Sequence, residues 1–346
     1  MKISFIIPVY NCEQFLEPCV YGIECIGAID YEIILVDDGS TDNSMYICDK
    51  LAKKNKKIHC IHQKNQGVSV ARNNGLKISN GDYIFFIDAD DTIEPKRFFY
   101  LIKKLEKDST INMAIFGVSF DYYNNNRLYR QEKMKPPLEG VKDRSLWIEE
   151  LQKLYYANSL SPIWNKIFKR SFLIDNQLYL RNDMFLYEDL EYSVRCMAHC
   201  DRILFEPEII YHYRQNEGNV GSRLKRLHHI SSLIDEIEVA FSRLIEMKNT
   251  EKVHCEIKKI LLTLYLVLVK EKITVSKFGE IACICDEFAA WYKDNNHYIA
   301  SKNEEIFINN LVKRKVVKLI IGRNYMLLRH KIAIKIKSIF CIKRND

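Results

Sequence analysis

"DYIFFIDADDTIEP", residues 82–95, places an apolar run directly before three carboxylates, Asp88, Asp90 and Asp91. Side chains two apart in an extended chain point to the same side, so Asp88 and Asp90 can face one site. One interpretation is a helix start, capped by Asp90 or Asp91, with Pro95 early in the helix. The other is a divalent cation that carries a phosphorylated ligand. The neighbouring segments decide between the two.

The first third of the chain alternates apolar runs with helix-like segments. We expect strands at 3–10, 31–39, 57–63, 83–88 and 111–120, and helices at 13–25, 43–54, 67–78 and 94–107. The runs are continuously apolar, as in strands covered on both faces, which predicts a doubly wound, mostly parallel α/β sheet. Ligands of such sheets bind outside the carboxyl ends of the strands. Three polar segments fall at those ends: Pro8-Val9-Tyr10-Asn11, Asp37-Asp38-Gly39-Ser40 and Asp88-Ala89-Asp90.

After residue 120 the pattern becomes polar and then helical. Residues 121–140 are polar and aromatic, as in a loop or a pair of edge strands, and we expect helices at 143–158 and 186–200. From about residue 223 the chain is expected to be helical nearly to its end, because it contains little Gly and no Pro there. This change in texture predicts a boundary near residue 222.

Composition and charge limit the classes of function. The 346 residues are 47% hydrophobic and 28% charged, which argues against wholesale disorder and predicts roughly two domains. The net charge is +7, and residues 313–344 contain no acid at all. Apolar residues lie between the cations of this segment, which predicts binding to an anionic membrane surface. Nucleic acid is the competing partner, but no zinc-finger spacing or RNA-binding signature supports it.

The sequence predicts neither a membrane span nor an export signal. The apolar run at 260–269 is too short to cross a bilayer, and Pro8 and Asn11 interrupt the N-terminal apolar segment. The 11 cysteines include no C-x-x-C pair, so we expect reduced thiols rather than a disulfide framework. In "HCIH" (59–62), apolar residues of an expected strand surround the histidines, which favours a structural role over a metal cluster. We expect a cytoplasmic protein, peripheral on the membrane.

The residues also limit how the chain can bind phosphate. It contains no G-x-x-x-x-G-K-[ST] sequence, and "GVSVARNNG" (67–75) is not a G-x-G-x-x-G fingerprint. A phosphate site made from carboxylates needs a metal, and Mg²⁺ or Mn²⁺ prefers oxygen ligands such as Asp88 and Asp90. Arg72 and free backbone N–H groups of a helix that starts near Gly67 would also favour phosphate. The alternative for Arg72 is a surface cation on an amphipathic helix.

Three further segments have open interpretations. In "VDDGSTD" (36–42) a strand-to-helix turn explains the last four residues, whereas one of the two leading carboxylates can accept a hydrogen bond from a nucleotide. In "FLYEDLEYSVR" (185–195) the acids fit either a first helix turn or a general base near a metal site. In "YHYR", His212 and Arg214 are expected to face one way, and a lone histidine is more often structural.

Residues 3–120 resemble the family 2 glycosyltransferases of the GT-A fold. The motifs "PVYN", "EIILVDDGSTD", "NQGVSVARNNG" and "GDYIFFIDADD" occur in that family's order and approximate spacing. Further on, "WNKIFKRSFL" and "LYEDLEYSVR" resemble its members in bacterial polysaccharide synthesis. Each motif is weak alone, and together they are highly specific.

The resemblance implies a donor site at the carboxyl ends of the strands. Asp88 and Asp90 match the pair that meets the divalent metal, Mg²⁺ or Mn²⁺, and the ribose and diphosphate of the donor. Pro8, Tyr10 and Asp38 match positions that line the pocket for the nucleotide base and ribose.

It also implies the catalytic residues. Arg72 matches the arginine beside the base and diphosphate, and Asp189 matches the usual catalytic base. Glu188 matches the neighbour that orients the acceptor or the loop. His212 and Arg214 match a less uniform position near the diphosphate.

The implied function is inverting, metal-dependent transfer of a sugar from a nucleoside-diphosphate sugar to a hydroxyl of a glycan or lipid-linked glycan, in bacterial surface polysaccharide synthesis. Residues 1–120 would bind the nucleotide sugar, 121–222 would hold the acceptor and the base, and 223–346 would be helical with a basic tail. The chain has no Q-x-x-R-W motif, which disfavours a processive synthase. A catalytically silent, membrane-tethered scaffold and a nucleotidyltransferase are the alternatives; the latter usually has a Gly-rich loop, where this chain has Pro8–Asn11.

Overall fold

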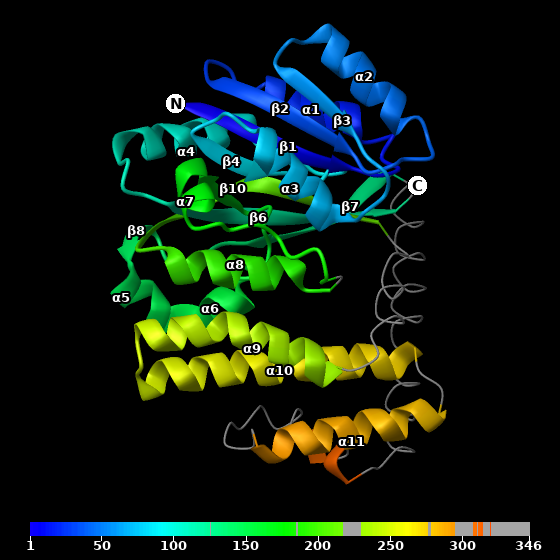
Figure 1. Ribbon diagram of the computed structural model, residues 1–346, viewed down its shortest axis with the longest axis vertical. Coiled ribbons are helices and arrows are strands. Elements are labelled where there is room, and N and C mark those ends of the chain that lie inside the picture. Colours follow the sequence, from blue (N-terminus) through cyan, green and yellow to red (C-terminus); the bar gives the residue numbers. More distant parts are fainter. Residues whose placement is uncertain are drawn as a thin grey trace, which may run out of the picture. The chain divides into compact units, whose positions relative to one another are not determined.

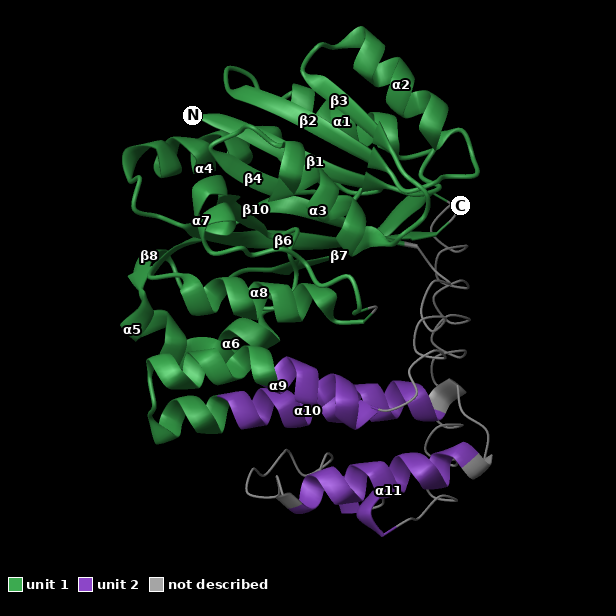
Figure 2. Ribbon diagram, in the orientation of Figure 1, with its two compact units in different colours: residues 1–219, 239–256 green, residues 220–238, 257–346 purple. Residues whose placement is uncertain are grey.

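The computed structural model describes residues 1–124, 126–184, 186–216, 230–275, 278–294, 307–309, 311–313 and 319. The chain divides into two compact units (Figure 2). The first comprises Met1–Asn219 and Val239–Glu256, and the second Val220–Glu238 and Ile257–Asp346. The predicted division of roles among 1–120, 121–222 and 223–346 stays a prediction.

A ten-stranded mixed sheet forms the core of the first unit (Figure 1). Its strands are β1 (Lys2–Val9), β2 (Asp30–Asp37), β3 (Ile58–His62), β4 (Tyr83–Phe86), β5 (Thr92–Ile93), β6 (Met113–Asn124), β7 (Arg127–Met134), β8 (Gly140–Asp143), β9 (Lys166–Lys169) and β10 (Arg202–Asn216). Their order is β3-β2-β1-β4-β9-β6-β10-β5, with β7 paired to β6 and β8 paired to β10. β3, β2, β1 and β4 run parallel, as do β6 and β10. The predicted α/β class and the five predicted strands are confirmed.

Apart from the two-residue β5, the elements that sequence patterns did not predict lie beyond residue 120 of this unit. β9 inserts between β4 and β6 and is antiparallel to both. β6 continues past residue 120 and forms a hairpin with β7, so the expected edge strands occur there. The expected helix at 143–158 is instead three short elements: α5 (Arg144–Trp147), a 3₁₀ turn (Ile148–Glu150) and α6 (Leu151–Tyr156).

Helices cover both faces of the sheet. The remaining helices of this half of the chain are α1 (Leu16–Glu24), α2 (Ser44–Lys54), α3 (Val68–Ile78), α4 (Pro95–Lys107), α7 (Arg170–Asp175) and α8 (Glu188–His199). Phe5 and Ile6 are neighbours on β1, so their side chains point to opposite faces. Phe98 of α4 contacts the Phe5 ring at 5.5 Å between centroids. On the other face, a Cβ added to Gly75 of α3 would lie 2.4 Å from Ile6 Cγ2, so only glycine permits this close approach.

α8 shares the face that α3 covers. Its Tyr192 lies 6.4 Å from the ring of Phe86, the residue that pairs with Ile6 across β1 and β4. Asn73 of α3 is bonded twice to the chain that leads to α8, because its Nδ2 donates to Leu180 O and its Oδ1 accepts from Leu180 N, both at 2.8 Å. These bonds therefore join α3 to the segment that leads to α8, on the same face of the sheet.

The three polar segments meet at the carboxyl ends of β1, β2 and β4, as predicted. Val9 pairs with Asp37, and Asp38 N donates to Val9 O at 2.8 Å. Ile87 N donates to Ile6 O at 3.0 Å, so the turn after β4 starts at the same end of the sheet. The candidate site lies at this end.

Beyond residue 229 the described residues are helical apart from short turns, as the sequence predicted. The helices are α9 (Ile230–Met247), α10 (Glu251–Val275) and α11 (Phe278–Asp294). Within the second unit, Tyr265 contacts the rings of Phe288 and Trp291 at 5.2 and 4.7 Å. No helix among the described residues combines the length and apolarity that a bilayer crossing requires. The basic segment 313–344 lies outside the described residues, apart from Lys313 and Leu319.

Candidate functional site

The turn after β4 is held by the most buried of its three carboxylates, Asp91. Tyr211 Oη donates to Asp91 Oδ2 at 2.6 Å and accepts from Asp88 N at 3.1 Å. Arg214 N donates to the other oxygen, Asp91 Oδ1, at 2.6 Å. Helix α4 has Glu94 at its N-cap and no side-chain capping bond, so the helix-cap interpretation of this acidic group is wrong. Asp91 fixes the turn, and Asp88 and Asp90 project from it.

Asp88 and Asp90 supply two carboxylates of the kind that a divalent cation binds. Burial, and then the charge of Asp88, raises the pKa of Asp90 to about 6, whereas the Arg214 guanidinium opposes this shift. That guanidinium lies 3.7 Å from the Tyr123 ring centroid and 4.6 Å from the Phe15 ring centroid. Carboxylate oxygens are the ligands that Mg²⁺ and Mn²⁺ prefer. The residues present therefore fit the expected metal.

Arg72 connects this turn to helix α8. Its side chain is 3% exposed, and it donates from Nη2 to Asp88 Oδ1 and from Nη1 to Asp189 Oδ1, each at 2.8 Å. The alternative interpretation of Arg72 as a surface cation is wrong, because its side chain is buried. A cation this buried must be paired, and Arg72 is paired with two carboxylates. α3 presents Arg72 one turn before Gly75, where the helix lies closest to β1.

Asp189 stands in the first turn of α8, after a strained residue. Tyr187 adopts left-handed backbone angles, φ 56° and ψ 21°, which cost a bulky residue about 1–3 kcal/mol. Burial raises the pKa of Asp189 to about 6; the Arg72 guanidinium opposes the shift, and Glu188 and Asp88 add to it. A carboxylate with this pKa is suited to general base catalysis near neutral pH.

The other acids of this turn differ in their surroundings. Glu191 Oε1 accepts from Arg195 Nε at 2.8 Å, so this acid has a structural role within α8. Glu188 is buried beside Asp189.

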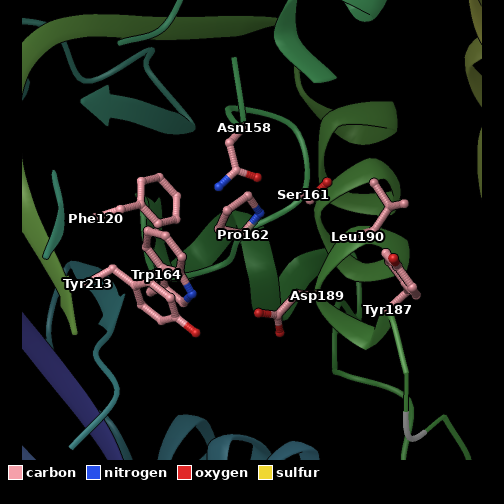
Figure 3. Close-up of a pocket in the computed structure, with 9 residues that line it drawn as sticks. All are labelled: Phe120, Asn158, Ser161, Pro162, Trp164, Tyr187, Asp189, Leu190 and Tyr213. Atoms are coloured by element: carbon pink, nitrogen blue, oxygen red, sulfur yellow. The ribbon is translucent and has the colours of Figure 1, made fainter. Parts of the chain in front are cut away.

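The Asp189 side chain lines a cavity of about 260 Å³ (Figure 3). The cavity is lined by Phe120, Asn158, Ser161, Pro162, Trp164, Tyr187, Asp189, Leu190 and Tyr213. Trp164 stacks on Tyr213 with ring centroids 4.8 Å apart and planes 5° apart. In Figure 3 the Asp189 carboxylate lies between these aromatic rings and the side chains of Tyr187 and Leu190. A cavity with an aromatic wall and one carboxylate has the mixture of groups typical of small-molecule sites.

Asp38 binds the loop that precedes α3. Its carboxylate accepts from Gln63 Nε2 at 2.8 Å, Gln66 N at 2.8 Å and Gly67 N at 2.9 Å. Two of the N–H groups that we expected to be free for phosphate therefore bond to Asp38. Tyr10, at the end of β1, is 48% exposed.

Pro8, near the end of the same strand, is partly exposed. The predicted contacts of Pro8, Tyr10 and Asp38 with a nucleotide stay predictions.

His212 and Arg214 lie on the face of β10 opposite Tyr211 and Tyr213, as their alternation predicts. His212 Nδ1 lies 2.9 Å from Asp121 Oδ2 and its Nε2 lies 3.8 Å from Glu94 Oε2. Their proximity to a diphosphate stays a prediction.

Several residues of the site were not singled out from the sequence, among them Tyr211, Trp164 and Lys166. Tyr211 links Asp88 and Asp91, and Trp164 stacks on Tyr211 with centroids 4.8 Å apart. Lys166 is fully buried and donates to Pro162 O and, at 2.8 Å, to Asn165 Oδ1. Burial lowers the pKa of Lys166 to about 7, and the charge of Asp189 opposes the shift. The available signals were the motif "WNKIF" and the tyrosines of "YHYR".

Comparisons with known proteins identify the family. The family model described as "Glycosyl transferase family 2" matches residues 4–175. The "Uncharacterized glycosyltransferase EpsJ" of Bacillus subtilis is 30% identical over 220 residues, which are 63% of this chain and 62% of that relative. The "Poly(ribitol-phosphate) beta-glucosyltransferase" of Bacillus spizizenii is 29% identical over 220 residues, 62% of this chain and 32% of that relative. The matches span less than two thirds of the length of these two relatives.

Solved structures agree on the fold. The structure of TarS 1–349 of S. aureus in complex with UDP has a TM-score of 0.62 at 17% identity and covers 92% of this chain and 89% of that chain. The same protein in complex with UDP-GlcNAc has a TM-score of 0.61 at 18% identity and covers 85% of this chain and 81% of that chain. At these identities the likeness shows the GT-A fold alone. The family match over residues 4–175 shows that the chain belongs to glycosyltransferase family 2.

Proposed function

We propose that the protein is an inverting, metal-dependent glycosyltransferase of bacterial polysaccharide synthesis. It would move a sugar from a nucleoside-diphosphate sugar to a hydroxyl of a glycan or lipid-linked glycan. The observation that carries the proposal is the contact of one buried arginine, Arg72, with both Asp88 and Asp189 at 2.8 Å. This contact places a carboxylate suited to a metal–diphosphate next to a carboxylate suited to a base.

The donor would lie across the carboxyl ends of β1, β2 and β4. Pro8, Tyr10 and Asp38 would line the nucleoside, and Asp88 and Asp90 would hold the divalent metal. When bound, the metal supplies positive charge that stabilises the leaving diphosphate. Relatives support this class of donor, because TarS binds UDP and UDP-GlcNAc.

Arg72 and Asp189 would carry out the chemistry. As the acceptor oxygen attacks the anomeric carbon, Asp189 takes the hydroxyl proton, and the nucleoside diphosphate leaves with the bonding electron pair. Arg72 stabilises the charge that develops on the leaving group. Attack from the side opposite the leaving group inverts the anomeric configuration, and the single displacement needs one base rather than the carboxylate pair of a glycosidase. The aromatic wall of Trp164 and Tyr213 would hold the reacting sugars and exclude water.

Asp90→Asn tests the metal assignment. Removing one carboxylate charge should abolish metal-dependent binding of nucleoside diphosphate, measured by calorimetry with and without Mn²⁺, and leave the fold intact by circular dichroism. Asp30→Asn, the same exchange at the exposed first residue of β2, is the matched control and should bind as the wild type does. Unchanged affinity in Asp90→Asn would contradict the assignment.

Asp189→Asn tests the base. We expect transfer to fall by roughly 10²–10⁴-fold, the usual contribution of a general base, with donor binding retained. The assay screens nucleoside-diphosphate sugars with glycan acceptors and measures the nucleoside diphosphate released. Glu188→Gln is the paired control, and an active Asp189→Asn beside an inactive Glu188→Gln would reverse the two roles. No metal-dependent release from any donor would favour the scaffold alternative.

We also propose that residues 313–344 attach the protein to an anionic membrane surface, and with it to lipid-linked acceptors on the cytoplasmic face. Each Lys or Arg near an anionic leaflet contributes about 1 kcal/mol. The full chain should float with anionic liposomes at low salt and lose this property when 313–346 are deleted. Flotation that survives the deletion, or that high salt does not weaken, would contradict this proposal.

A further inference from the structure

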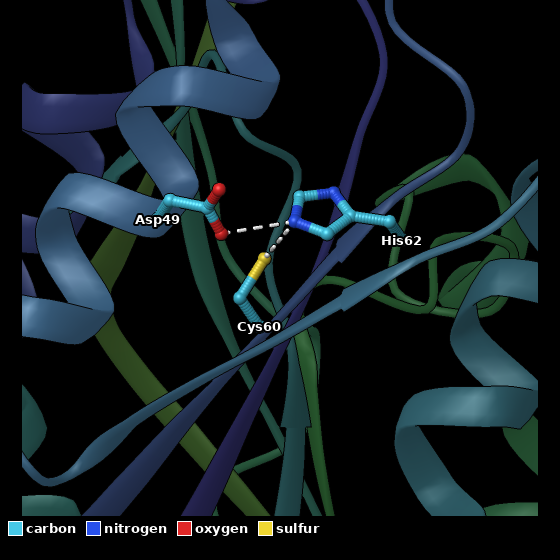
Figure 4. Close-up of side chains that lie close together, drawn as sticks. All are labelled: Asp49, Cys60 and His62. Carbon is cyan, nitrogen blue, oxygen red and sulfur yellow. Dashed lines mark hydrogen bonds and ion pairs between the residues drawn. The ribbon is translucent and has the colours of Figure 1, made fainter.

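A second group of ligand-type side chains, distinct from Asp88 and Asp90, lies at the edge strand β3. Asp49 comes from α2, and Cys60 and His62 come from the same face of β3 (Figure 4). His62 Nε2 lies 3.0 Å from Asp49 Oδ1 and 3.5 Å from Cys60 Sγ. All three ligand atoms lie within 4.8 Å of one another. Figure 4 shows the carboxylate and the thiol directed at the same ring nitrogen.

The chemistry of this group suits zinc rather than magnesium. Imidazole nitrogen, thiolate sulfur and carboxylate oxygen are the ligands that Zn²⁺ takes in proteins, and thiolate selects against Mg²⁺. Zinc bonds of about 2.0–2.3 Å at tetrahedral angles put neighbouring ligand atoms roughly 3.3–3.8 Å apart. The 3.0 and 3.5 Å separations need only small adjustments to reach this range. The Asp49 and His62 side chains are 50% and 37% exposed, so an ion can reach them.

The ring of His62 is already oriented for a metal. Its other nitrogen, Nδ1, lies 3.1 Å from Oδ2 of Asp37, whose side chain is 2% exposed. Asp37 is fixed in turn, because its Oδ1 accepts from Ser40 N at 3.1 Å. A buried carboxylate on the far ring nitrogen is the usual partner of a metal-bound histidine, since it sets the tautomer and the ring direction. The contact of His62 with Asp37 therefore supports a metal site, because a surface ion pair between His62 and Asp49 would not need it.

Cys60 supplies the third ligand. Its side chain is partly exposed, so an ion can reach the sulfur, which binds metal as the thiolate. We propose that Asp49, Cys60 and His62 bind a divalent transition-metal ion of the zinc class, with water in the fourth position. The ion would tie α2 to the edge of the sheet, independently of the ion at Asp88 and Asp90.

The pattern "HCIH" alone favoured a structural role, because its histidines lie among apolar residues of an expected strand. The two histidines are three residues apart, a spacing that puts them on opposite faces of a strand. The structure selects Cys60 and His62 instead, two residues apart, and brings Asp49 from a helix to meet them. His59 is exposed and offers a control on the same strand.

The test uses the full chain, stripped of metal and titrated with zinc chloride in a calorimeter. Excess Mg²⁺ is present throughout to occupy Asp88 and Asp90. The wild type should bind one zinc ion, and His62→Gln and Cys60→Ser should lose that binding. The matched controls His59→Gln and Cys25→Ser, an exposed histidine and an exposed thiol, should bind as the wild type does.

Two further measurements separate a metal site from a general effect on the fold. Asp37→Asn should weaken zinc binding by about 10–100-fold, the usual effect of losing the partner of a histidine ligand. Cobalt(II) in place of zinc should show a thiolate charge-transfer band that Cys60→Ser abolishes, and thermal unfolding confirms that each variant is folded. No zinc uptake by the wild type, equal affinity in His62→Gln and His59→Gln, absence of the thiolate band, or loss of zinc in Asp90→Asn alone would overturn the proposal.

Discussion

A buried guanidinium between two carboxylates fixes the geometry of the site. Arg72 is 3% exposed and holds Asp88, after β4, and Asp189, at the start of α8, at 2.8 Å each. Removing an ionic group from water costs several kcal/mol, which both carboxylates together must offset. The metal-side carboxylate and the candidate base therefore cannot move independently. The charge of a substrate bound beside either carboxylate would therefore affect both Asp88 and Asp189 through Arg72.

Several less conspicuous features keep Arg72 in place. The missing side chain at Gly75 lets α3 approach β1, and Asp38 holds the loop before that helix through three hydrogen bonds. Asn73 fastens α3 to the chain that leads to α8. At the other end, the left-handed Tyr187 sets the start of α8. Such strain persists only where surrounding contacts enforce it, and it is common at functional sites.

The sequence predicted those parts of the fold that rest on local patterns. The apolar runs predicted β1 to β4 and β6. The polar residues at the ends of these strands predicted that Asp88 belongs to the site. The four-residue β9 was missed because its place depends on pairing with distant strands. In the same way, Arg72 and Asp189 were each named, but a contact across 117 residues has no local signal. The roles of Tyr211 and Trp164 follow from hydrogen bonds and ring stacking between distant elements, which composition does not encode.

The pH dependence of kcat/KM, in wild type and Arg72→Gln at saturating metal, tests the coupling of Arg72 to Asp189 most directly. A base must be deprotonated, so activity should fall as the pH drops below about 6, the raised pKa of Asp189. Loss of the neighbouring cation should raise that pKa by about one unit or more and move the acid limb to higher pH. Arg72→Lys retains the charge and should shift the limb less. An acid limb at the same pH in all three proteins would contradict the account.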